Sequence, residues 1–124
     1  MLVDRVDGEV LDAAGPSLRV VANVAVGYDN VDVAACRERG VVVTNTPGVL
    51  TDATADIAMS LILMSTRGLG VAERRVRTGV PWRWSLTAHL GSGLRGRTLG
   101  IVGPGAIGLA TARRAKAFGM EVLL

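Results

Sequence analysis

The strongest constraint on the fold is a short apolar run that leads directly into a pattern of three glycines. Residues 99–102 predict a buried strand, and the sequence Gly-x-Gly-x-x-Gly follows over residues 103–108. A helical pattern runs over residues 106–118, and Gly119 ends it before a second apolar run at residues 122–124. The order strand, tight turn, helix, strand is typical of an α/β protein with a parallel sheet.

Each glycine of this pattern has its own predicted task. Gly103 allows the sharp turn, Gly105 lets the backbone approach a pyrophosphate, and Gly108 lets the helix lie close to the strand. The first turn of the helix offers unpaired N–H groups and about half a positive charge from the aligned peptide dipoles. We therefore predict that a dinucleotide phosphate binds here. A glycine-rich turn without a ligand is the alternative, and the strand and helix that flank the turn favour binding.

The composition is that of a globular protein with the size of one ordinary domain. Of the 124 residues, 49% are hydrophobic and 20% are charged. The longest apolar stretch, residues 57–64, is interrupted by Ser60 and is too short to span a bilayer. Asp4, Arg5 and Asp7 fall where a signal peptide would need an apolar segment. We therefore expect a cytoplasmic protein without a membrane partner.

The net charge of +3 reflects 14 basic against 11 acidic residues. Basic residues gather near residues 74–77 and 113–116, and such groups on helices are usually solvated faces. Neither group alternates with the aromatic side chains that stack on bases, so we expect no nucleic-acid partner. Cys36 is the single cysteine, which excludes an internal disulfide and a cysteine-built metal site. We predict that Cys36 is buried on a helix, and we expect no metal.

The first 48 residues predict a strand–helix–strand unit. Residues 19–26 are rich in valine and nearly all apolar, as in a strand buried on both faces of a parallel sheet. A helix is predicted over residues 31–39, capped by Asn30 or Asp29, and a second strand over residues 41–44. Ahead of this unit we predict the tail of a strand at residues 1–3 and a short helix at residues 8–14 that Asp7 caps.

The end of the first of these strands is a candidate ligand site. Ligands of open α/β sheets bind beyond the carboxyl ends of the strands, which is where Val26, Gly27 and residues 45–48 fall. The backbone N–H groups of Val26 and Gly27 could hold a small anion such as a carboxylate. Gly27 could equally serve only to permit the turn, and the residues alone leave both interpretations open.

A long helix is predicted over residues 51–66, with Thr51 or Asp52 as its cap. Because almost no polar face remains on this helix, we expect it to be enclosed between layers, domains or subunits. A more amphipathic helix follows over residues 67–77.

Residues 79–96 are rich in glycine and proline and predict a connecting loop. We expect Trp82 and Trp84 to pin this loop to an apolar surface. His89 lies in the loop without a carboxylate nearby in sequence, so it is interpreted as a surface or packing residue.

Two long segments together resemble a known family. They are VANVAVGYDNVDVAACRERGVVVTNTPGVLTDATADIAMSLIL and LRGRTLGIVGPGAIGLATARRAKAFGMEV. Both resemble the NAD(P)-dependent D-2-hydroxyacid dehydrogenases, and within that family most of all the glyoxylate/hydroxypyruvate reductases. The resemblance implies a flavodoxin-like substrate domain followed by a Rossmann domain with a doubly wound parallel sheet. Residues 1–48 would be part of the first domain, and residues 49–124 would form the interdomain helix and the start of the second.

The resemblance also implies roles for individual residues. By this likeness Val26 and Gly27 hold the substrate carboxylate through their N–H groups, and Thr54 faces the cofactor. The residues implied to contact the pyrophosphate are Gly103, Gly105, Ala106, Ile107 and Gly108. The family often carries arginine where this chain has Ala106, and a hydrogen bond from arginine to a charged phosphate is worth about 1.5–3 kcal/mol.

The activity implied by the resemblance is hydride transfer from NADH or NADPH to a small 2-oxoacid such as glyoxylate or hydroxypyruvate, in a homodimer. The catalytic arginine, glutamate and histidine of the family follow the glycine turn, whereas His89 precedes it. We therefore expect the chain to be an inactive central fragment with no catalytic residue of its own. The alternative is a non-catalytic, nucleotide-sensing module that binds partners, as in the corepressors that resemble this family.

Overall fold

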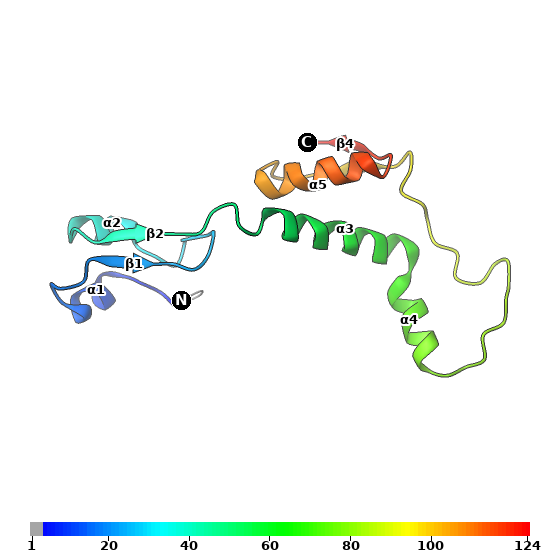
Figure 1. Cartoon of the computed structure of the whole chain (residues 1–124), viewed down its shortest axis with the longest axis horizontal. Coiled ribbons are helices and arrows are strands. Elements are labelled where there is room, and N and C mark those ends of the chain that lie inside the picture. Colours follow the sequence, from blue (N-terminus) through cyan, green and yellow to red (C-terminus); the bar gives the residue numbers. More distant parts are fainter. Residues whose placement is uncertain (1–3) are drawn as a thin grey trace. The chain divides into compact units, whose positions relative to one another are not determined.

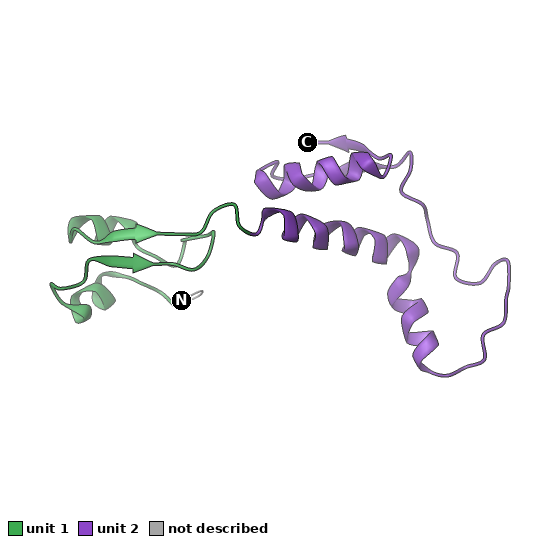
Figure 2. Ribbon diagram, in the orientation of Figure 1, with its two compact units in different colours: residues 1–49 green, residues 50–124 purple. Residues whose placement is uncertain are grey.

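The computed structural model describes residues 4–124, so the strand tail predicted at residues 1–3 lies outside the described part of the chain. The chain forms two compact units, Met1–Val49 and Leu50–Leu124 (Figure 2). Each unit contains one pair of parallel strands with helices packed beside it, as the sequence predicts for an α/β fold.

The first unit is built on strands β1 (Val20–Ala22) and β2 (Val42–Thr44), which pair in parallel with Val21 opposite Val43. Helices α1 (Gly8–Ala14) and α2 (Val33–Glu38) complete this unit. The core of the unit consists of Val6, Leu11, Val31, Ala35, Cys36 and Val41, so the predicted burial of Cys36 on a helix is confirmed. Only Val21 and Val43 of the two strands pack against this core, which makes the predicted burial of the first strand on both faces wrong.

Helix α2 begins at Val33 instead of the predicted residue 31, because Val31 pairs with another part of the chain. Val31 forms a parallel bridge with Val6, and the N–H of Asp32 donates to the carbonyl of Val6 at 2.8 Å. The chain is therefore extended through Val31, and neither Asn30 nor Asp29 can cap the helix. Asp32 is the cap instead, because its carboxylate accepts from the N–H of Ala35 at 2.8 Å. The predicted cap of α1 is confirmed, since the side chain of Asp7 accepts from Val10.

The second unit consists of three helices and two strands (Figure 1). They are α3 (Thr51–Arg67), α4 (Leu69–Arg77), β3 (Thr98–Gly100), α5 (Ala106–Ala117) and β4 (Glu121–Leu123). Strands β3 and β4 pair in parallel, with Leu99 opposite Val122, and α5 packs on α3. The core of this unit is formed by Met59, Leu94, Ala115 and Met120.

Helix α3 is less enclosed within its unit than its sequence predicts. Ala55 and Met59 are buried, whereas Ile57 and Leu61 are 61% and 59% exposed. Thr51 is the first residue of the helix, and among the described residues no side chain caps it, so the prediction of Thr51 or Asp52 as the cap is wrong. No single helix of the described residues is long and apolar enough to cross a membrane. Helices α3 and α4 taken together are long and apolar enough by length and composition, but the chain bends by 72° between them.

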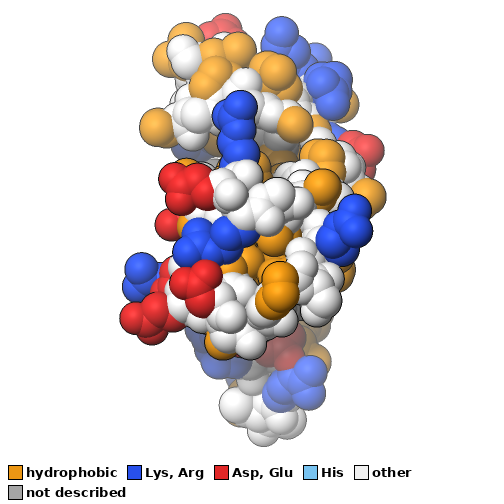
Figure 3. All heavy atoms as spheres, turned by 90° about the vertical axis from the view of Figure 1, so that its left-hand side faces the viewer, with side chains coloured by type: hydrophobic (Ala, Val, Ile, Leu, Met, Phe, Trp, Pro, Cys, Tyr) orange, Lys and Arg blue, Asp and Glu red, His pale blue; other side chains and the backbone are white. Residues whose placement is uncertain are grey.

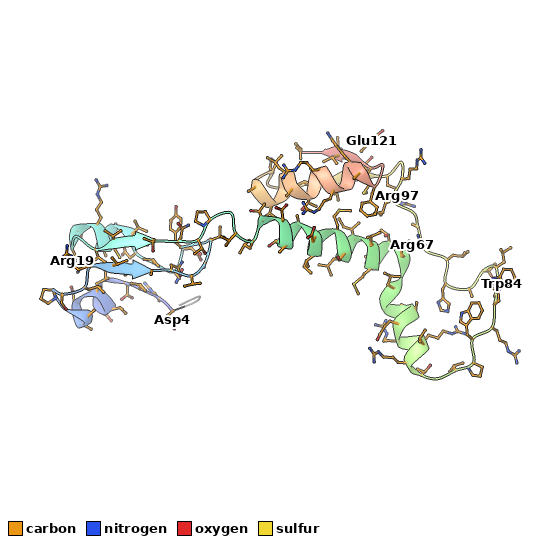
Figure 4. The ribbon with its side chains drawn as sticks, in the orientation of Figure 1. Asp4, Arg19, Arg67, Trp84, Arg97 and Glu121 are labelled. Carbon is orange, nitrogen blue, oxygen red and sulfur yellow. The ribbon has the colours of Figure 1, made fainter. Side chains whose placement is uncertain are left out.

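The loop between α4 and β3 is anchored differently from the prediction. Trp82 and Trp84 are 72% and 73% exposed, and Trp84 lies far out on the loop (Figure 4). The loop is instead fixed to the end of α3, where the N–H of Ser92 donates to Thr66 O at 2.7 Å. A Cβ at Gly91 would lie 2.7 Å from the Cα of Arg67, so only glycine fits this contact. His89 is exposed, as predicted, with its Nε2 atom 3.1 Å from the Arg75 guanidinium.

Candidate cofactor and anion sites

The glycine turn of the second unit connects β3 to α5. Gly103 has a φ of +86°, which is strained for any other residue, so the sharp turn requires glycine here. A Cβ at Gly108 would lie 2.6 Å from the carbonyl oxygen of Gly103 and 3.2 Å from Ile101 Cγ2. Gly108 is therefore what allows the first turn of α5 to pack against the turn that precedes it.

Gly105 differs from its two neighbours in the motif, because the fold of the described chain does not require it. Its φ of −76° and ψ of −167° are open to any residue, and no atom lies within 4 Å of the place a Cβ would take. The structure therefore gives steric reasons for Gly103 and Gly108 but none for Gly105. A ligand that approaches the backbone at this point would supply that reason.

The first turn of α5 has donors to offer such a ligand. Gly105 precedes the helix without a side-chain cap among the described residues, and its carbonyl accepts the first helical hydrogen bond, from Leu109 at 2.8 Å. In the described part of the chain, the N–H groups of Ala106, Ile107 and Gly108 have no acceptor. These groups and the positive end of the helix dipole fit a pyrophosphate.

Thr54 lies exposed in the first turn of α3, and α3 and α5 begin at the same end of their unit (Figure 1). Arg114 of α5 fastens the two helices together. Its Nε lies 2.6 Å from Asp56 Oδ1 and its terminal nitrogen 3.0 Å from Asp52 Oδ1. Hydrogen bonds with Asp56 and then Asp52 raise the pKa of Arg114 further above its usual range. This role is not evident from the sequence, where Arg114 belongs to a basic group typical of a solvated helix face.

The candidate anion loop of the first unit, residues 25–27, follows β1 and is held by three hydrogen bonds to successive carbonyl oxygens. These run from Thr46 N to Ala25 O at 2.9 Å, from Asn45 Nδ2 to Val26 O at 2.9 Å, and from Asn23 Nδ2 to Gly27 O at 2.7 Å. The chain bends at Ala25 and Val26, so that both carbonyls point to the end of β2. The sequence placed Asn45, within residues 45–48, at this end of the strands without a role of its own, and it did not single out Asn23.

The N–H groups of the anion loop point the other way. In a planar trans peptide the N–H lies opposite the carbonyl, so the N–H groups of Val26 and Gly27 are directed away from β2. Neither N–H has an acceptor within residues 4–124. Gly27 does not have a positive φ, and a Cβ there would meet only the Asp29 carboxylate, at 3.3 Å. The backbone conformation therefore favours the anion-binding interpretation of Gly27 over its alternative role in permitting the turn.

Among the described residues, the Asp29 carboxylate lies beside the Cβ position of Gly27, and neither candidate site contains a cluster of metal ligands. On the face turned to the viewer in Figure 3, acidic and basic side chains are interspersed with hydrophobic ones instead of gathering by sign. Within the described residues, no group of three histidine, cysteine, aspartate or glutamate side chains is placed to hold a metal ion. Both candidate sites are thus built mainly from backbone N–H groups.

The parallel strands, the helices that connect them and the glycine turn define an α/β protein of the Rossmann type. The sequence profile of the D-isomer specific 2-hydroxyacid dehydrogenase family, catalytic domain, matches residues 1–123. The chain belongs to this family, which confirms the resemblance seen in the sequence.

Relatives and solved structures support this assignment. The chain is 53% identical over 127 residues to a glyoxylate reductase of Korarchaeum cryptofilum, an alignment that covers 99% of this chain and 37% of that protein. A crystal structure from Thermus thermophilus matches with a TM-score of 0.92 and 50% identity, over 96% of this chain and 38% of that one.

A third similar protein has been solved with bound molecules. It is an NADPH-dependent glyoxylate/hydroxypyruvate reductase of Sinorhizobium meliloti, in complex with NADP and malonate. The match has a TM-score of 0.77 and 46% identity, and it covers 96% of this chain and 37% of that one. The chain thus spans less than two fifths of the length of the relatives it matches.

Proposed function

We propose that the whole protein is an oxidoreductase that uses NADH or NADPH to reduce a small 2-oxoacid such as glyoxylate or hydroxypyruvate. The observation that carries this proposal is the position of Gly105 beside three N–H groups of α5 that have no acceptor, although neither its backbone angles nor a neighbour among the described residues requires glycine there. The glyoxylate reductases among the relatives support the choice of substrate. The S. meliloti structure, which contains NADP, supports the choice of cofactor.

Under this proposal the chain contributes binding and orientation. The N–H groups of Ala106, Ile107 and Gly108 hold the pyrophosphate, and Thr54 faces the cofactor. The N–H groups of Val26 and Gly27 hold the substrate carboxylate, which fixes the position of the adjacent carbonyl carbon. The bound nicotinamide supplies the hydride. Two backbone N–H groups can hold a carboxylate without a charged side chain, and the candidate donors of this loop are backbone N–H groups.

We further assign residues 1–48 to a substrate domain, and residues 49–124 to the interdomain helix and the first part of the NAD(P)-binding domain. The division of the chain after Val49 and the parallel strand pair in each unit support this assignment. We infer that the catalytic arginine, glutamate and histidine implied by the family resemblance are not among these 124 residues. We therefore expect the 124 residues alone to show no reductase activity, since general acid catalysis typically contributes about 10²–10⁴ in rate.

We propose a homodimer as the state of the whole protein. Ile57 and Leu61 project from α3 with more than half of their surface exposed, and Val71 and Val76 of α4 are exposed as well. Large apolar patches are seldom left open on soluble monomers, and a second copy would cover this one. Sedimentation equilibrium of the whole protein tests this assignment, and a monomer at micromolar concentration would contradict it.

The function is tested by mixing the whole protein with NADH or NADPH and each oxoacid, and following the loss of reduced nicotinamide. Turnover of glyoxylate or hydroxypyruvate above a protein-free control is the expected result. Cofactor binding without turnover of any small 2-oxoacid would instead favour the nucleotide-sensing module. Absence of cofactor binding would reject both functions. Activity of the 124-residue chain by itself would show that its catalytic groups were misassigned.

A further inference from the structure

We propose that Asn23 and Asn45 are positioning residues that fix the direction in which the candidate anion loop presents its N–H groups. The inference rests on the proposed role of Val26 and Gly27 in binding the substrate carboxylate. It assigns a task to two side chains that would not themselves touch the substrate.

The two asparagines occupy equivalent places after paired strands. Asn23 follows β1 and Asn45 follows β2, so both lie at the carboxyl end of the parallel pair. The backbone N–H of Asn23 donates to Thr44 O at 2.9 Å, which extends the pairing by one step and leaves Asn23 only 3% exposed. Its side chain is therefore buried beneath the loop, next to Gly27.

Each side-chain amide acts on one peptide plane. Asn45 Nδ2 donates to Val26 O at 2.9 Å, and Asn23 Nδ2 donates to Gly27 O at 2.7 Å. Because a carbonyl only accepts hydrogen bonds, both amide groups must present their nitrogen to the loop. Fixing the carbonyl of Val26 fixes the N–H of Gly27 on the opposite side of the same plane. Fixing the carbonyl of Gly27 removes the remaining rotational freedom of this glycine.

The hydrogen bonds from Asn23 and Asn45 matter because glycine by itself does not fix the backbone conformation at residue 27. Gly27 has no side chain to pack and could adopt many backbone conformations. An N–H group aligned before the anion arrives binds it without a further ordering cost, so the two amides act by preorganisation. Asn23 carries a cost for this task, since its buried Oδ1 has no partner among the described residues. An apolar side chain of similar size would fill the same space without that cost.

The test replaces each asparagine with leucine in the whole protein, which removes the donor without adding a charge. We expect Asn23→Leu and Asn45→Leu to raise the KM for glyoxylate about tenfold, while the NADPH dissociation constant changes less than about twofold. The matched control is Asn30→Leu. Asn30 also donates from Nδ2 to a backbone carbonyl, that of Asp4 at 2.9 Å, but it does not hold the anion loop.

Equal KM values in the folded parent and in both folded variants would overturn the inference, and so would an equal rise in the Asn30→Leu control. Asn45 is only half-buried, so its variant serves if Asn23→Leu does not fold. A parent that reduces no 2-oxoacid would contradict the proposed function instead. The positioning role is then judged from the NMR signal of the Gly27 amide as oxamate is added. A shift in the parent that both variants lose supports the role, and identical behaviour of parent and variants, with or without a shift, rejects it.

Discussion

The chain contains two backbone segments suited to hold negative charge, and they are specified in different ways. The turn over residues 103–108 depends on its own glycines, because Gly103 needs a positive φ and Gly108 leaves no room for a Cβ. The anion loop depends on other parts of the chain, because Gly27 has neither constraint and is held by Asn23 and Asn45. Backbone segments whose N–H groups have no acceptor among the described residues can therefore be specified locally or through tertiary hydrogen bonds.

This difference predicts how each segment responds to substitution. In the glycine turn a methyl group should damage either the fold or the ligand site, depending on which glycine carries it. In the anion loop the glycine itself should tolerate a methyl group in the fold, and the surrounding amides should be the sensitive residues.

The largest effect is expected for Gly105→Val in the whole protein. The backbone angles at this position accept valine, and apart from the chain neighbours no atom of the described chain lies within 4 Å of the added Cβ. The fold should therefore be kept, with a loss of no more than about 1 kcal/mol in the free energy of unfolding because valine is a poorer N-cap than glycine. The side chain would occupy the approach of the pyrophosphate. Loss of two charge-assisted hydrogen bonds, at about 1.5–3 kcal/mol each, would lower NADPH affinity at least about a hundredfold. Calorimetry measures the NADPH dissociation constant, and an unchanged constant would show that the cofactor does not bind at this turn.

Gly108→Ala should instead act on the fold. The methyl group would lie 2.6 Å from the carbonyl oxygen of Gly103, so the helix or the turn must shift. We expect a loss of about 1–3 kcal/mol in the free energy of unfolding, as is typical of overpacked sites. The control is Gly100→Ala in β3, where no atom lies within 4 Å of the added group. Denaturant titration compares the two variants, and equal stabilities would disprove the close contact.

Gly27→Ala should have a small effect on stability. Its Cβ would meet only a flexible carboxylate oxygen of Asp29, at 3.3 Å, and the residue has no positive φ. We expect the free energy of unfolding to change by less than about 0.5 kcal/mol. A loss as large as that of Gly108→Ala, measured in the same denaturant series, would show that the anion loop is also specified by its own glycine.

The smallest effect concerns the ion pair between Asp12 and Arg39 in the first unit, whose Oδ1 and Nε atoms lie 2.8 Å apart. The hydrogen bond from Arg39 lowers the pKa of Asp12. The stabilisation is therefore complete above the pKa of an unfolded aspartate, about 3.9, and is lost as the pH falls through the lower pKa of the folded state. The Asp12→Asn variant should lack this dependence. Unfolding curves at stepwise lower pH should show parent and variant converging, and parallel curves would contradict the assignment.

The contrast between local and tertiary specification also explains what the sequence could predict. The strand, turn and helix around residues 99–118, the cap Asp7 and the loop over residues 79–96 depend on neighbours along the chain, and the structure confirms them. The cap Asp32 depends on the bridge between Val6 and Val31, which no local pattern reveals.

The candidate site follows the same division. Gly103, Gly105 and Gly108 could be selected from their spacing. For Val26 and Gly27 the residues alone left two interpretations open, and the family resemblance favoured anion binding. Their binding roles stay predictions. Asn23 was missed, and Asn45 was placed at the strand ends without a role, because their contacts with the loop depend on the pairing of β1 with β2. Asn45 donates to a residue 19 positions earlier in the chain. A polar residue directly after an apolar strand is the one signal that could have drawn attention to both.

The most direct test is a titration of the whole protein labelled with ¹⁵N-glycine, first with NADPH and then with oxamate as a stand-in for the oxoacid. We expect NADPH to shift the amide signals of Gly105 and Gly108 and oxamate then to shift that of Gly27. If these signals stay unchanged in both steps, or if oxamate shifts only glycines outside the anion loop, the proposed binding roles of the two segments are contradicted.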